Sequence, residues 1–406
     1  MSKVDKSVII IGAGVAGLTA AKFLKQFGFS VKVFEASDGV GGRLRTFKQD
    51  GFLLDKGFQV LLGAYPLAKE ILDYKALKLK PFLSGAKIFH AKGSSNVVDP
   101  LRKPNGLLET LLAPIGSIKD KLLMLKLKLI LKGKTVEEIF DAKEQSTMSF
   151  LMDYGFSEKM INNFFIPFLG GIFLEKELST SSRVFNFVFK MFGEGDALLP
   201  QDGIQAIPNQ LAQSLTQEEL FLNAKVIDIA PNKVTLANGE SHQSDVILIA
   251  TDELNIPSFN VKPKANYRKV LNIYFKSGQK PFHEALIGLV AKPNCLVNNV
   301  AVLDNVCPSY SVGNSFLISI SIIDYIIDVS LDENIKKIKD ELCKEIFFCE
   351  TNRDAETDEI DLLIFNKYVS FNSLEIIESY INKYSVIGFR NKSIIIRDSL
   401  EFDKIK

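Results

Sequence analysis

Three glycines near the start of the chain have the spacing of a phosphate-binding turn. Gly12, Gly14 and Gly17 form the pattern GxGxxG between an apolar run of strand length, Ser7–Ile11, and a helical pattern over residues 18–27. The first glycine of such a turn permits a tight bend, the second lets the backbone approach a pyrophosphate, and the third lets the helix pack on the strand. The helix N-terminus then offers N–H groups and a positive dipole end to the phosphates. The pattern therefore predicts a phosphate-binding strand–turn–helix unit.

A carboxylate follows at the position where such units hold a ribose. Glu35 ends a second strand pattern, Ser30–Phe34, about twenty residues beyond the turn. Its oxygens would accept hydrogen bonds from ribose hydroxyls, and its negative charge disfavours a 2′-phosphate. A strand, a helix and a strand in this order require a parallel sheet. These residues predict a dinucleotide site, but they do not separate NAD from FAD.

A second glycine-rich stretch comes soon after the carboxylate. Gly41 and Gly42 are adjacent and precede Arg43. Paired glycines allow a backbone path that follows a ligand closely, and an arginine supplies a planar cation with several donors for a diphosphate. Arg45, two residues further on, is interpreted as a solvated basic residue of the same turn. This stretch favours FAD over NAD.

At this point residues 7–60 resemble the flavin-dependent amine oxidase superfamily, which includes monoamine oxidases, protoporphyrinogen oxidases and phytoene-type carotenoid desaturases. The signature of that superfamily joins the GxGxxG turn, an acidic residue after the second strand, the GGR stretch and a D-x-G turn. The last of these is present as Asp55 and Gly57. Weaker similarity extends through residues 170–173 and 200–211 to Val226 and residues 246–252.

The resemblance implies non-covalently bound FAD, with its AMP half on the first strand–helix–strand unit and its isoalloxazine between two domains. The chemistry it implies is transfer of a hydride equivalent from a C–N or C–C bond of a small apolar or amine substrate to the flavin. Oxygen or another electron acceptor then reoxidises the flavin, and the protein contributes positioning and electrostatics. No catalytic residue can be named. The predicted cofactor-binding residues are Gly12, Gly14, Ala16, Gly17, Glu35, Gly41, Gly42, Arg43, Gly57, Phe58, Gln59, Val60, Val226 and Asp398.

The end of the sequence departs from this resemblance. Members of the superfamily finish with a strand, a Gly-Asp pair and a helix of small residues that covers the flavin. Here the last apolar run, residues 393–396, is followed by Arg397 and Asp398, and the eight residues after Asp398 lack that pattern. We therefore expect an open flavin half of the site. A non-catalytic nucleotide-binding or scaffold protein is the alternative function, and an NAD-dependent dehydrogenase is a third.

The expected fold is α/β, with a Rossmann-like FAD-binding domain built from discontinuous segments and an inserted α+β substrate domain. The FAD-binding segments are residues 1–80, 201–260 and 381–406, and the substrate segments are residues 81–200 and 261–380. Residues 225–251 predict short strands joined by turns. The two substrate segments are expected to be richer in helix patterns and in phenylalanine.

Composition excludes several other classes of protein. The chain has 406 residues, 47% of them hydrophobic, and a formal net charge of +1, so no overall field attracts nucleic acid. Its four cysteines contain no CxxC pair and its three histidines lie far apart, which argues against a zinc site or a disulfide framework. No signal-peptide pattern precedes the first strand. We expect a cytoplasmic protein, and the oligomeric state is left open.

Two apolar stretches have alternative interpretations. Residues 119–132 alternate lysines with leucines, but the lysines fall on opposite sides of a helical wheel, whereas a membrane-surface helix would gather them on one face. A partly covered helix with snorkelling lysines is therefore favoured over peripheral membrane contact. Residues 161–192 are rich in phenylalanine, and packing in the core is favoured over a substrate tunnel.

Overall fold

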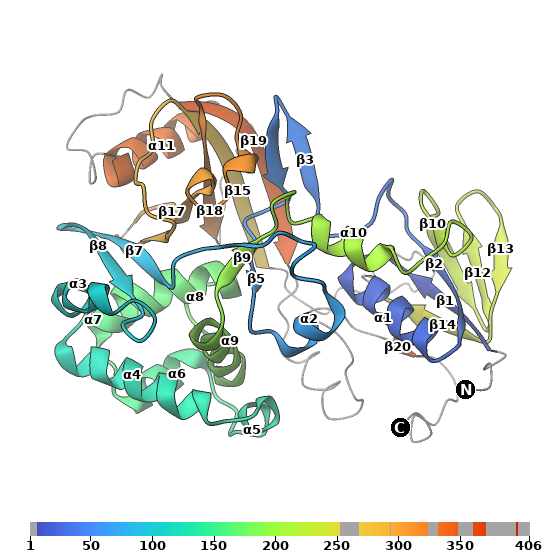
Figure 1. The fold of residues 1–406 in the computed structure, drawn as a ribbon, viewed down its shortest axis with the longest axis horizontal. Coiled ribbons are helices and arrows are strands. Elements are labelled where there is room, and N and C mark those ends of the chain that lie inside the picture. Colours follow the sequence, from blue (N-terminus) through green and yellow to red (C-terminus); the bar gives the residue numbers. More distant parts are fainter. Residues whose placement is uncertain are drawn as a thin grey trace.

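The computed structural model describes residues 6–251, 268–292, 294–323, 332–347, 360–370 and 395–396. Figure 1 shows a small sheet with its helices at one end of the molecule, a larger sheet in the upper part, and a group of helices at the other end. Within these residues no helix is both long and apolar enough to cross a membrane.

The predicted parallel strand–helix–strand unit is confirmed. β1 and β2 have the predicted bounds, and α1 (Val15–Gln26) joins them but begins three residues before the predicted helix. Ile9 and Ile10 of β1 are 1% and 0% exposed, as expected for a strand covered on both faces. In sheet order the strands are β10 (Leu220–Phe221), β2 (Ser30–Phe34), β1 (Ser7–Ile11), β14 (Val246–Ile249) and β20 (Ile395–Ile396). All pair in parallel except β20, which is antiparallel to β14.

A small antiparallel sheet precedes β14, as the pattern over residues 225–251 predicts. It consists of β11 (Val226–Ala230), β12 (Lys233–Leu236) and β13 (Ser241–Gln243). Asn232 and Gly239 occupy the two turns with φ of 59° and 89°, a region that asparagine and glycine tolerate. Val234 of this sheet packs with Phe34 and Ile9 of the parallel sheet.

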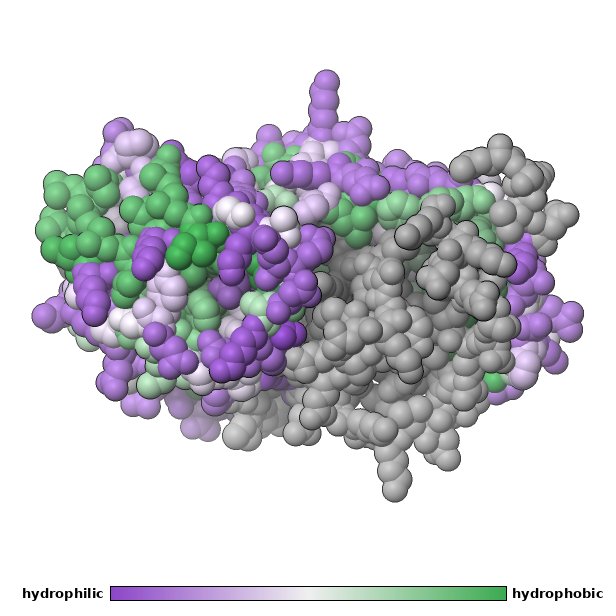
Figure 2. All heavy atoms as spheres, turned by 90° about the horizontal axis from the view of Figure 1, so that it is seen from below, coloured by the Kyte–Doolittle hydropathy of each residue, from purple (hydrophilic) through white to green (hydrophobic). Residues whose placement is uncertain are grey.

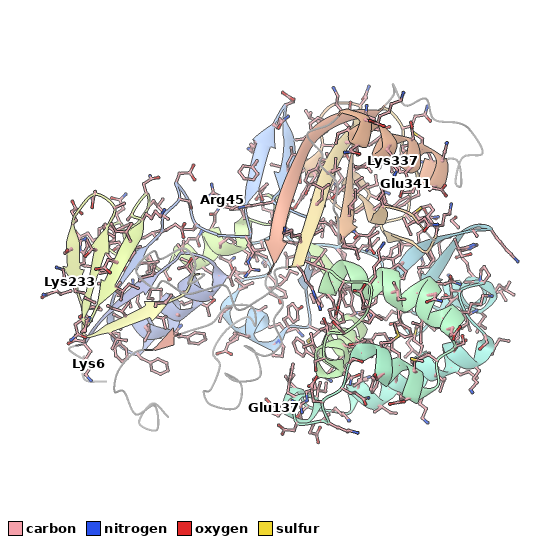
Figure 3. The ribbon with its side chains drawn as sticks, turned by 180° about the vertical axis from the view of Figure 1, so that it is seen from behind. Lys6, Arg45, Glu137, Lys233, Lys337 and Glu341 are labelled. Carbon is pink, nitrogen blue, oxygen red and sulfur yellow. The ribbon has the colours of Figure 1, made fainter. Side chains whose placement is uncertain are left out.

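The large sheet joins two distant parts of the chain. In sheet order its strands are β19 (Ile360–Ser370), β15 (Arg268–Ser277), β18 (Phe316–Ile323), β17 (Val297–Val302), β16 (Ile287–Val290), β7 (Gly85–His90) and β8 (Gly93–Val98). α11 (Asp332–Leu342) and the π-helix η7 (Cys343–Phe347) pack on one face. Glu341 of α11, which is labelled in Figure 3, accepts a hydrogen bond at 2.9 Å from the backbone N–H of Val297.

The expectation that residues 261–380 are rich in helix is wrong for the part that the structure describes. Five of the seven strands of the large sheet come from this segment. Phe316–Ile323 alternates serine with isoleucine, which is the two-residue period of a strand and not the period of a helix. The five-segment division into domains stays a prediction.

Helices fill most of the segment between β8 and residue 195. They are α3 (Leu107–Leu112), α4 (Ile118–Lys132), α5 (Val136–Phe140), α6 (Thr147–Tyr154), α7 (Glu158–Met160), the π-helix η2 (Ile161–Phe165), α8 (Ile166–Phe173) and α9 (Ser182–Glu194). Phe165, Phe173 and Phe185 are at most 2% exposed and belong to one cluster. Phe165 contacts Phe185 edge to face, with ring centroids 5.9 Å apart. These contacts support the core interpretation of residues 161–192.

Short elements connect the parallel sheet to the rest of the molecule. They are β3 (Thr46–Gln49), β4 (Phe52–Asp55), β5 (Leu61–Leu62), α2 (Pro66–Ile71), β6 (Lys80–Pro81), β9 (Ala197–Leu199) and α10 (Ala206–Ala212). β3 and β4 form a hairpin, and β9 pairs with both β5 and β6. Residues near 200 therefore lie beside residues near 60 and 80.

A buried carboxyl group, Asp55 at the end of β4, connects four segments. It accepts hydrogen bonds from the Thr46 hydroxyl (2.6 Å), the Ile204 backbone N–H (2.9 Å) and the Tyr310 hydroxyl (2.8 Å). The Tyr274 hydroxyl of β15 donates to the Asp55 backbone carbonyl at 3.0 Å. Burial raises the pKa of Asp55 from 3.8 to about 6, against the opposing effect of the three donors to its carboxyl group.

We predict that Asp55 makes the protein less stable as the pH rises from about 4 to about 6. Because its pKa in the folded state lies above its unfolded value, the folded state binds the proton more tightly in this window, and the free energy of unfolding falls as the proton leaves. The expected loss is roughly 2–3 kcal/mol. In Asp55→Asn an amide replaces the carboxyl group, so this part of the pH dependence should disappear.

Urea unfolding of both proteins at pH 4.5 and pH 7.5 measures this difference. Asp153→Asn, at an exposed aspartate of α6, is the control and should keep the pH dependence of the wild type. Parallel pH profiles for the wild type and Asp55→Asn would refute the prediction.

Candidate dinucleotide-binding site

At two of the three glycine positions in the turn after β1, no residue larger than glycine fits. Gly12 has φ of +102°, and a Cβ there would lie 3.0 Å from the carbonyl oxygen of Ala250. A Cβ on Gly17 would lie 2.0 Å from the carbonyl oxygen of Gly12, far inside contact distance. The first turn of α1 therefore lies directly on the end of β1, and this contact explains the third glycine of the pattern.

The N-terminus of α1 has no side-chain cap. Gly14 is the N-cap residue, and α1 has no acidic residue in its first turn. The first N–H groups of a helix need partners from outside it, and the helix dipole favours an anion at this end. Ala16 lies in this first turn and is half-buried. The turn thus presents backbone donors where a phosphate group fits.

The carboxylate of Glu35 is held against the glycine turn. Its Oε2 accepts a hydrogen bond from the backbone N–H of Ala13 at 2.8 Å. Its Oε1 accepts from Ser37, from the backbone N–H at 3.0 Å and from the hydroxyl at 2.7 Å. A carboxylate has about four acceptor positions, so three bonds leave capacity for a ribose hydroxyl. Glu35 is thus oriented before any ligand binds.

The double glycine lies beside the first glycine turn. The Gly41 N–H donates to the carbonyl of Ala13 at 2.9 Å, and Gly14 and Gly41 form a parallel bridge. Gly41 and Gly42 have φ of +117° and +60°, and a Cβ on Gly41 would lie 2.2 Å from the Leu44 carbonyl oxygen. Arg43 follows directly and is half-buried. The structure therefore brings the two glycine-rich stretches together, with Glu35 at the first.

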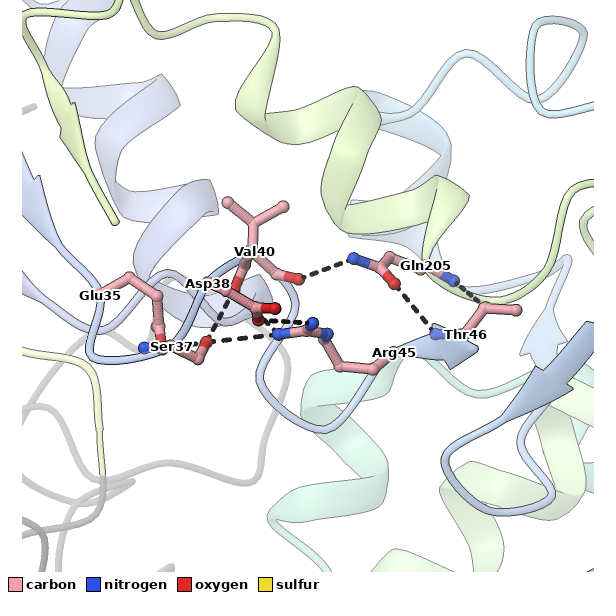
Figure 4. A network of polar contacts seen from close by, with 8 residues as sticks. Glu35, Ser37, Asp38, Val40, Arg45, Thr46 and Gln205 are labelled. Atoms are coloured by element: carbon pink, nitrogen blue, oxygen red, sulfur yellow. Dashed lines mark hydrogen bonds and ion pairs between the residues drawn. The ribbon is translucent and has the colours of Figure 1, made fainter. Parts of the chain in front are cut away.

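The interpretation of Arg45 as a solvated turn residue is wrong. Its side chain is 17% exposed and forms an ion pair with Asp38 at 2.9 Å (Figure 4). It also donates to the Ser37 hydroxyl and the Gly39 carbonyl, both at 3.3 Å. The hydrogen bond and charge of Arg45 lower the pKa of Asp38. Arg45 therefore closes the loop that begins at Glu35.

A residue from a distant segment holds the other side of this loop. The side-chain oxygen of Gln205 accepts from the Thr46 N–H at 3.0 Å, and its amide nitrogen donates to the Val40 carbonyl at 3.3 Å (Figure 4). The Gln205 N–H also donates to the Thr46 hydroxyl at 3.0 Å. The stretch around residues 200–211 thus supports the double-glycine loop.

The segment before β11 runs along the other side of Glu35. The Glu35 N–H donates to the Phe221 carbonyl at 2.9 Å, and the Ala224 N–H donates to the Glu35 carbonyl at 2.8 Å. Phe221 stacks on Phe34 with ring centroids 5.0 Å apart. Val226, two residues after Ala224, is 4% exposed and packs with the residues of β1. Val226 therefore lies two residues after a residue whose backbone is hydrogen-bonded to Glu35.

The remaining predicted site residues lie elsewhere. Gly57 has φ of +100° and donates to the Asp55 carbonyl at 2.7 Å. Phe58, Gln59 and Val60 are half-buried on the connection from β4 to β5, where Phe58 and Val60 pack against the cluster shared with the large sheet. The Lys56 N–H just before Gly57 donates to the Arg45 carbonyl at 2.7 Å, so this group begins beside the end of the double-glycine loop and continues toward the large sheet. Asp398 lies outside the described residues.

Sequence reasoning missed Ser37, Asp38, Thr46 and Gln205. Their partners are set by loop geometry, and Thr46 and Gln205 lie 159 positions apart. The one signal for Gln205 was the weak resemblance over residues 200–211. Among the described residues no group of three or more histidine, cysteine, aspartate or glutamate side chains is arranged to hold a metal ion.

The residues of the turn fit one half of an adenine dinucleotide. A pyrophosphate needs close backbone approach and free donors, which the glycines and the uncapped α1 provide. A ribose needs an oriented acceptor, which Glu35 provides. The fold and this site define a dinucleotide-binding α/β protein.

Comparisons with known proteins agree with this class. The family model described as flavin containing amine oxidoreductase matches residues 15–276, more than half of the chain. Protoporphyrinogen oxidase 2, chloroplastic/mitochondrial, of Arabidopsis thaliana is 26% identical over 263 residues, which cover 56% of this chain and 51% of that protein. L-amino acid oxidase Bs29 of Bothriechis schlegelii is 25% identical over 309 residues, which cover 68% and 59%.

A solved structure shares the fold. An oxidoreductase from Methanosarcina mazei superposes with a TM-score of 0.66 at 15% identity, covering 90% of this chain and 88% of that one. The chain belongs to the flavin containing amine oxidoreductase family, whose members use FAD. It spans between half and three fifths of the length of the two curated relatives described above.

We predict that Gly17→Ala destabilises the protein and Gly278→Ala does not. The new Cβ at position 17 would meet the Gly12 carbonyl oxygen at 2.0 Å, so α1 must move away from β1. A Cβ added to Gly278 would meet no atom within 4 Å, and Gly278 has no positive φ. We expect Gly17→Ala to cost roughly 1–3 kcal/mol, measured by urea unfolding. Equal stability of the two variants would show that the close approach is not required.

Proposed function

We propose that this protein is an FAD-dependent oxidoreductase that removes a hydride equivalent from a small apolar or amine substrate. Oxygen or another acceptor would then take the electrons. The observation that supports the proposal is the hydrogen bond from the Ala13 N–H to Glu35, which holds this carboxylate, the proposed ribose acceptor, beside the turn that contains Gly12 and Gly17. Membership of the family supports FAD as the dinucleotide.

Each part of the site has a proposed role in holding the cofactor. The uncapped N-terminus of α1 would bind the pyrophosphate, and Arg43 would add a cation beside it. Glu35 would accept hydrogen bonds from the ribose of the adenosine half. Val226 would lie near the adenine ring, and residues 57–60 would face the flavin half. Bound FAD supplies the two-electron acceptor, and these residues position it.

We infer the class of substrate from the names of the two curated relatives. The names of the two curated relatives describe a protoporphyrinogen oxidase and an L-amino acid oxidase, so a porphyrinogen and an amine-bearing molecule are the first candidates to assay. We propose that this chain acts on a substrate of that kind.

We predict that Glu35→Ala lowers FAD affinity by about tenfold to a hundredfold. The change removes the ribose acceptor and leaves the Ala13 N–H without its carboxylate partner. Titration of the apoprotein with FAD, followed by quenching of flavin fluorescence, measures the affinity. Glu137→Gln, at an exposed glutamate of α5, is the matched control and should bind as the wild type does. Unchanged affinity in Glu35→Ala would exclude the proposed ribose contact.

The visible spectrum and a turnover assay separate the three candidate functions. Oxidised-flavin bands that survive gel filtration, together with reduction of an artificial electron acceptor by one of the candidate substrates, support the oxidoreductase. Bound flavin without turnover on either substrate favours the non-catalytic protein. Binding of NAD but not FAD in parallel titrations would favour the dehydrogenase.

A further inference from the structure

The helical region exposes most of the large apolar side chains that face solvent. Of the fifteen exposed large hydrophobic residues in the described part of the chain, nine fall between Leu101 and Ile130. Scattered apolar residues are normal on a protein surface, but a contiguous patch marks a contact surface. Figure 2 shows apolar side chains gathered at the end of the molecule where α3 to α7 lie in Figure 1, with hydrophilic ones between them.

α4 turns apolar side chains to both of its faces. Leu127 and Leu131 are each 2% exposed and pack in the helical core. On the opposite face Ile118, Leu122 and Leu129 are 65%, 60% and 54% exposed. Their spacing of four and seven residues places them in one stripe along the helix. The solvent-facing side of α4 is therefore apolar along its length.

α3 extends the same kind of surface. Leu108 and Leu112, one helical turn apart, are 69% and 73% exposed, the two highest values in this region. Thr110, between them, anchors the helix by exchanging hydrogen bonds at 3.0 and 3.1 Å with the backbone of Val98 in β8. Lys121 of α4 donates to the Ala113 carbonyl just after α3 at 2.8 Å. α3 and α4 are thus held to the core and to each other while their leucines point outward.

The same segment carries a concentrated positive charge. Residues 101–132 contain seven basic and two acidic residues, a net charge of +5, whereas the whole chain has +1. One of the acids, Asp120, is 1% exposed and accepts hydrogen bonds from Ser117 and Ser157. Arg102 and Lys128 are paired with Asp196 and Asp99, which lie outside the segment. The other basic residues leave the surface of this segment apolar and basic.

The lysines of α4 border its apolar stripe on both sides. At 100° per residue, Lys119 and Lys126 fall on one side of Ile118, Leu122 and Leu129, and the remaining lysines of α4 fall on the other. On the second side Lys121 donates to the Leu111 and Ala113 carbonyls, and Lys128 is paired with Asp99. The exposed lysines, Lys119, Lys126 and Lys132, can extend their charges toward water or lipid phosphates while their stems cover apolar surface. The arrangement on opposite sides of the wheel, which argued against membrane contact in the sequence alone, becomes two charged margins once the outer face of α4 is known.

We propose that α3 and α4 dock the protein on the surface of an anionic membrane, with the exposed leucines entering the boundary between headgroups and acyl chains. Apolar area and attraction to anionic lipid both contribute to binding of this kind. The proposal is independent of the proposed oxidoreductase function.

The charge and the apolar stripe of this surface favour an anionic membrane over a second copy of the chain or a nucleic acid. A second copy of the chain on the same patch would form a two-fold interface, which sets each basic margin against its equivalent. Nucleic acid would use the lysines but offers no partner for the leucine stripe. An anionic bilayer surface complements both features.

The test uses the full chain and two kinds of vesicle, phosphatidylcholine alone and phosphatidylcholine mixed with phosphatidylglycerol. We expect the protein to sediment with the mixed vesicles, more weakly at high salt, and far less with the neutral ones. Absence of sedimentation with the mixed vesicles at low salt overturns the proposal.

Variants assign the binding to this surface. Leu112→Glu combined with Leu122→Glu should lower partitioning at least about tenfold, and Lys119→Gln combined with Lys126→Gln should lower it about fivefold for each charge. Val312→Glu, at a valine that is 47% exposed outside this segment, should bind as the wild type does. Because all of these side chains are exposed, melting temperatures should stay near the wild-type value and verify folding.

Two further outcomes contradict the proposal. Undiminished vesicle binding by the Leu112→Glu, Leu122→Glu protein would place the contact elsewhere. A wild-type dimer in sedimentation equilibrium that these substitutions convert to monomer, without vesicle binding by the wild type, would assign the patch to a second copy of the chain.

Discussion

The close approach of α1 to the end of β1 is the constraint on which the proposed cofactor site depends. Gly17 lies so near the Gly12 carbonyl that no side chain fits between them. The uncapped N-terminus of α1 lies beside the loop that contains Gly41, because Gly14 and Gly41 form a bridge. Glu35 then reaches the Ala13 N–H because β2 lies next to β1 in parallel register. Turn, helix end and carboxylate therefore form one unit, in which a displacement of any part alters the other two.

Asp55 connects the β3–β4 hairpin to the large sheet. Its carboxyl group gathers donors from β3, from the segment before α10 and from residue Tyr310, while Tyr274 of β15 bonds its backbone carbonyl. Removing a carboxyl group from water is costly, and the raised pKa reflects that cost. Saturating the group with donors offsets part of it and limits the geometries that β4 and β15 can adopt relative to each other. Because Thr46 also bonds Gln205, the same network extends to the double-glycine loop.

Local patterns could be predicted from the sequence, and long-range partnerships could not. β1, β2 and the turns around β12 follow from apolar runs and from glycine and asparagine positions, which depend on neighbouring residues only. The large sheet was missed because its strands come from two regions far apart in the chain, and burial on both sides conceals the alternation in most of them. Arg45 was misjudged for a different reason. Its partners Asp38 and Gly39 are near in sequence, but only the path of the loop brings them to its guanidinium.

The outer face of α4 shows what a helical wheel leaves undetermined. Leu122 and Leu127 are the same residue type on opposite faces, and nothing local identifies which of them meets the core. Asp120 decides the orientation: as part of the Ser117 capping box it also accepts from Ser157, which turns its side of the helix inward and makes Leu127 and Leu131 the buried pair. Ile118 and Leu122 must then face outward. The stripe of Ile118, Leu122 and Leu129 therefore stays exposed to solvent. The packing of α4 in the core depends on its buried face, so the stability of the single chain does not explain why the exposed positions are apolar. The proposed membrane-docking surface would account for it, and the exposed Lys119, Lys126 and Lys132 beside the stripe favour an anionic partner.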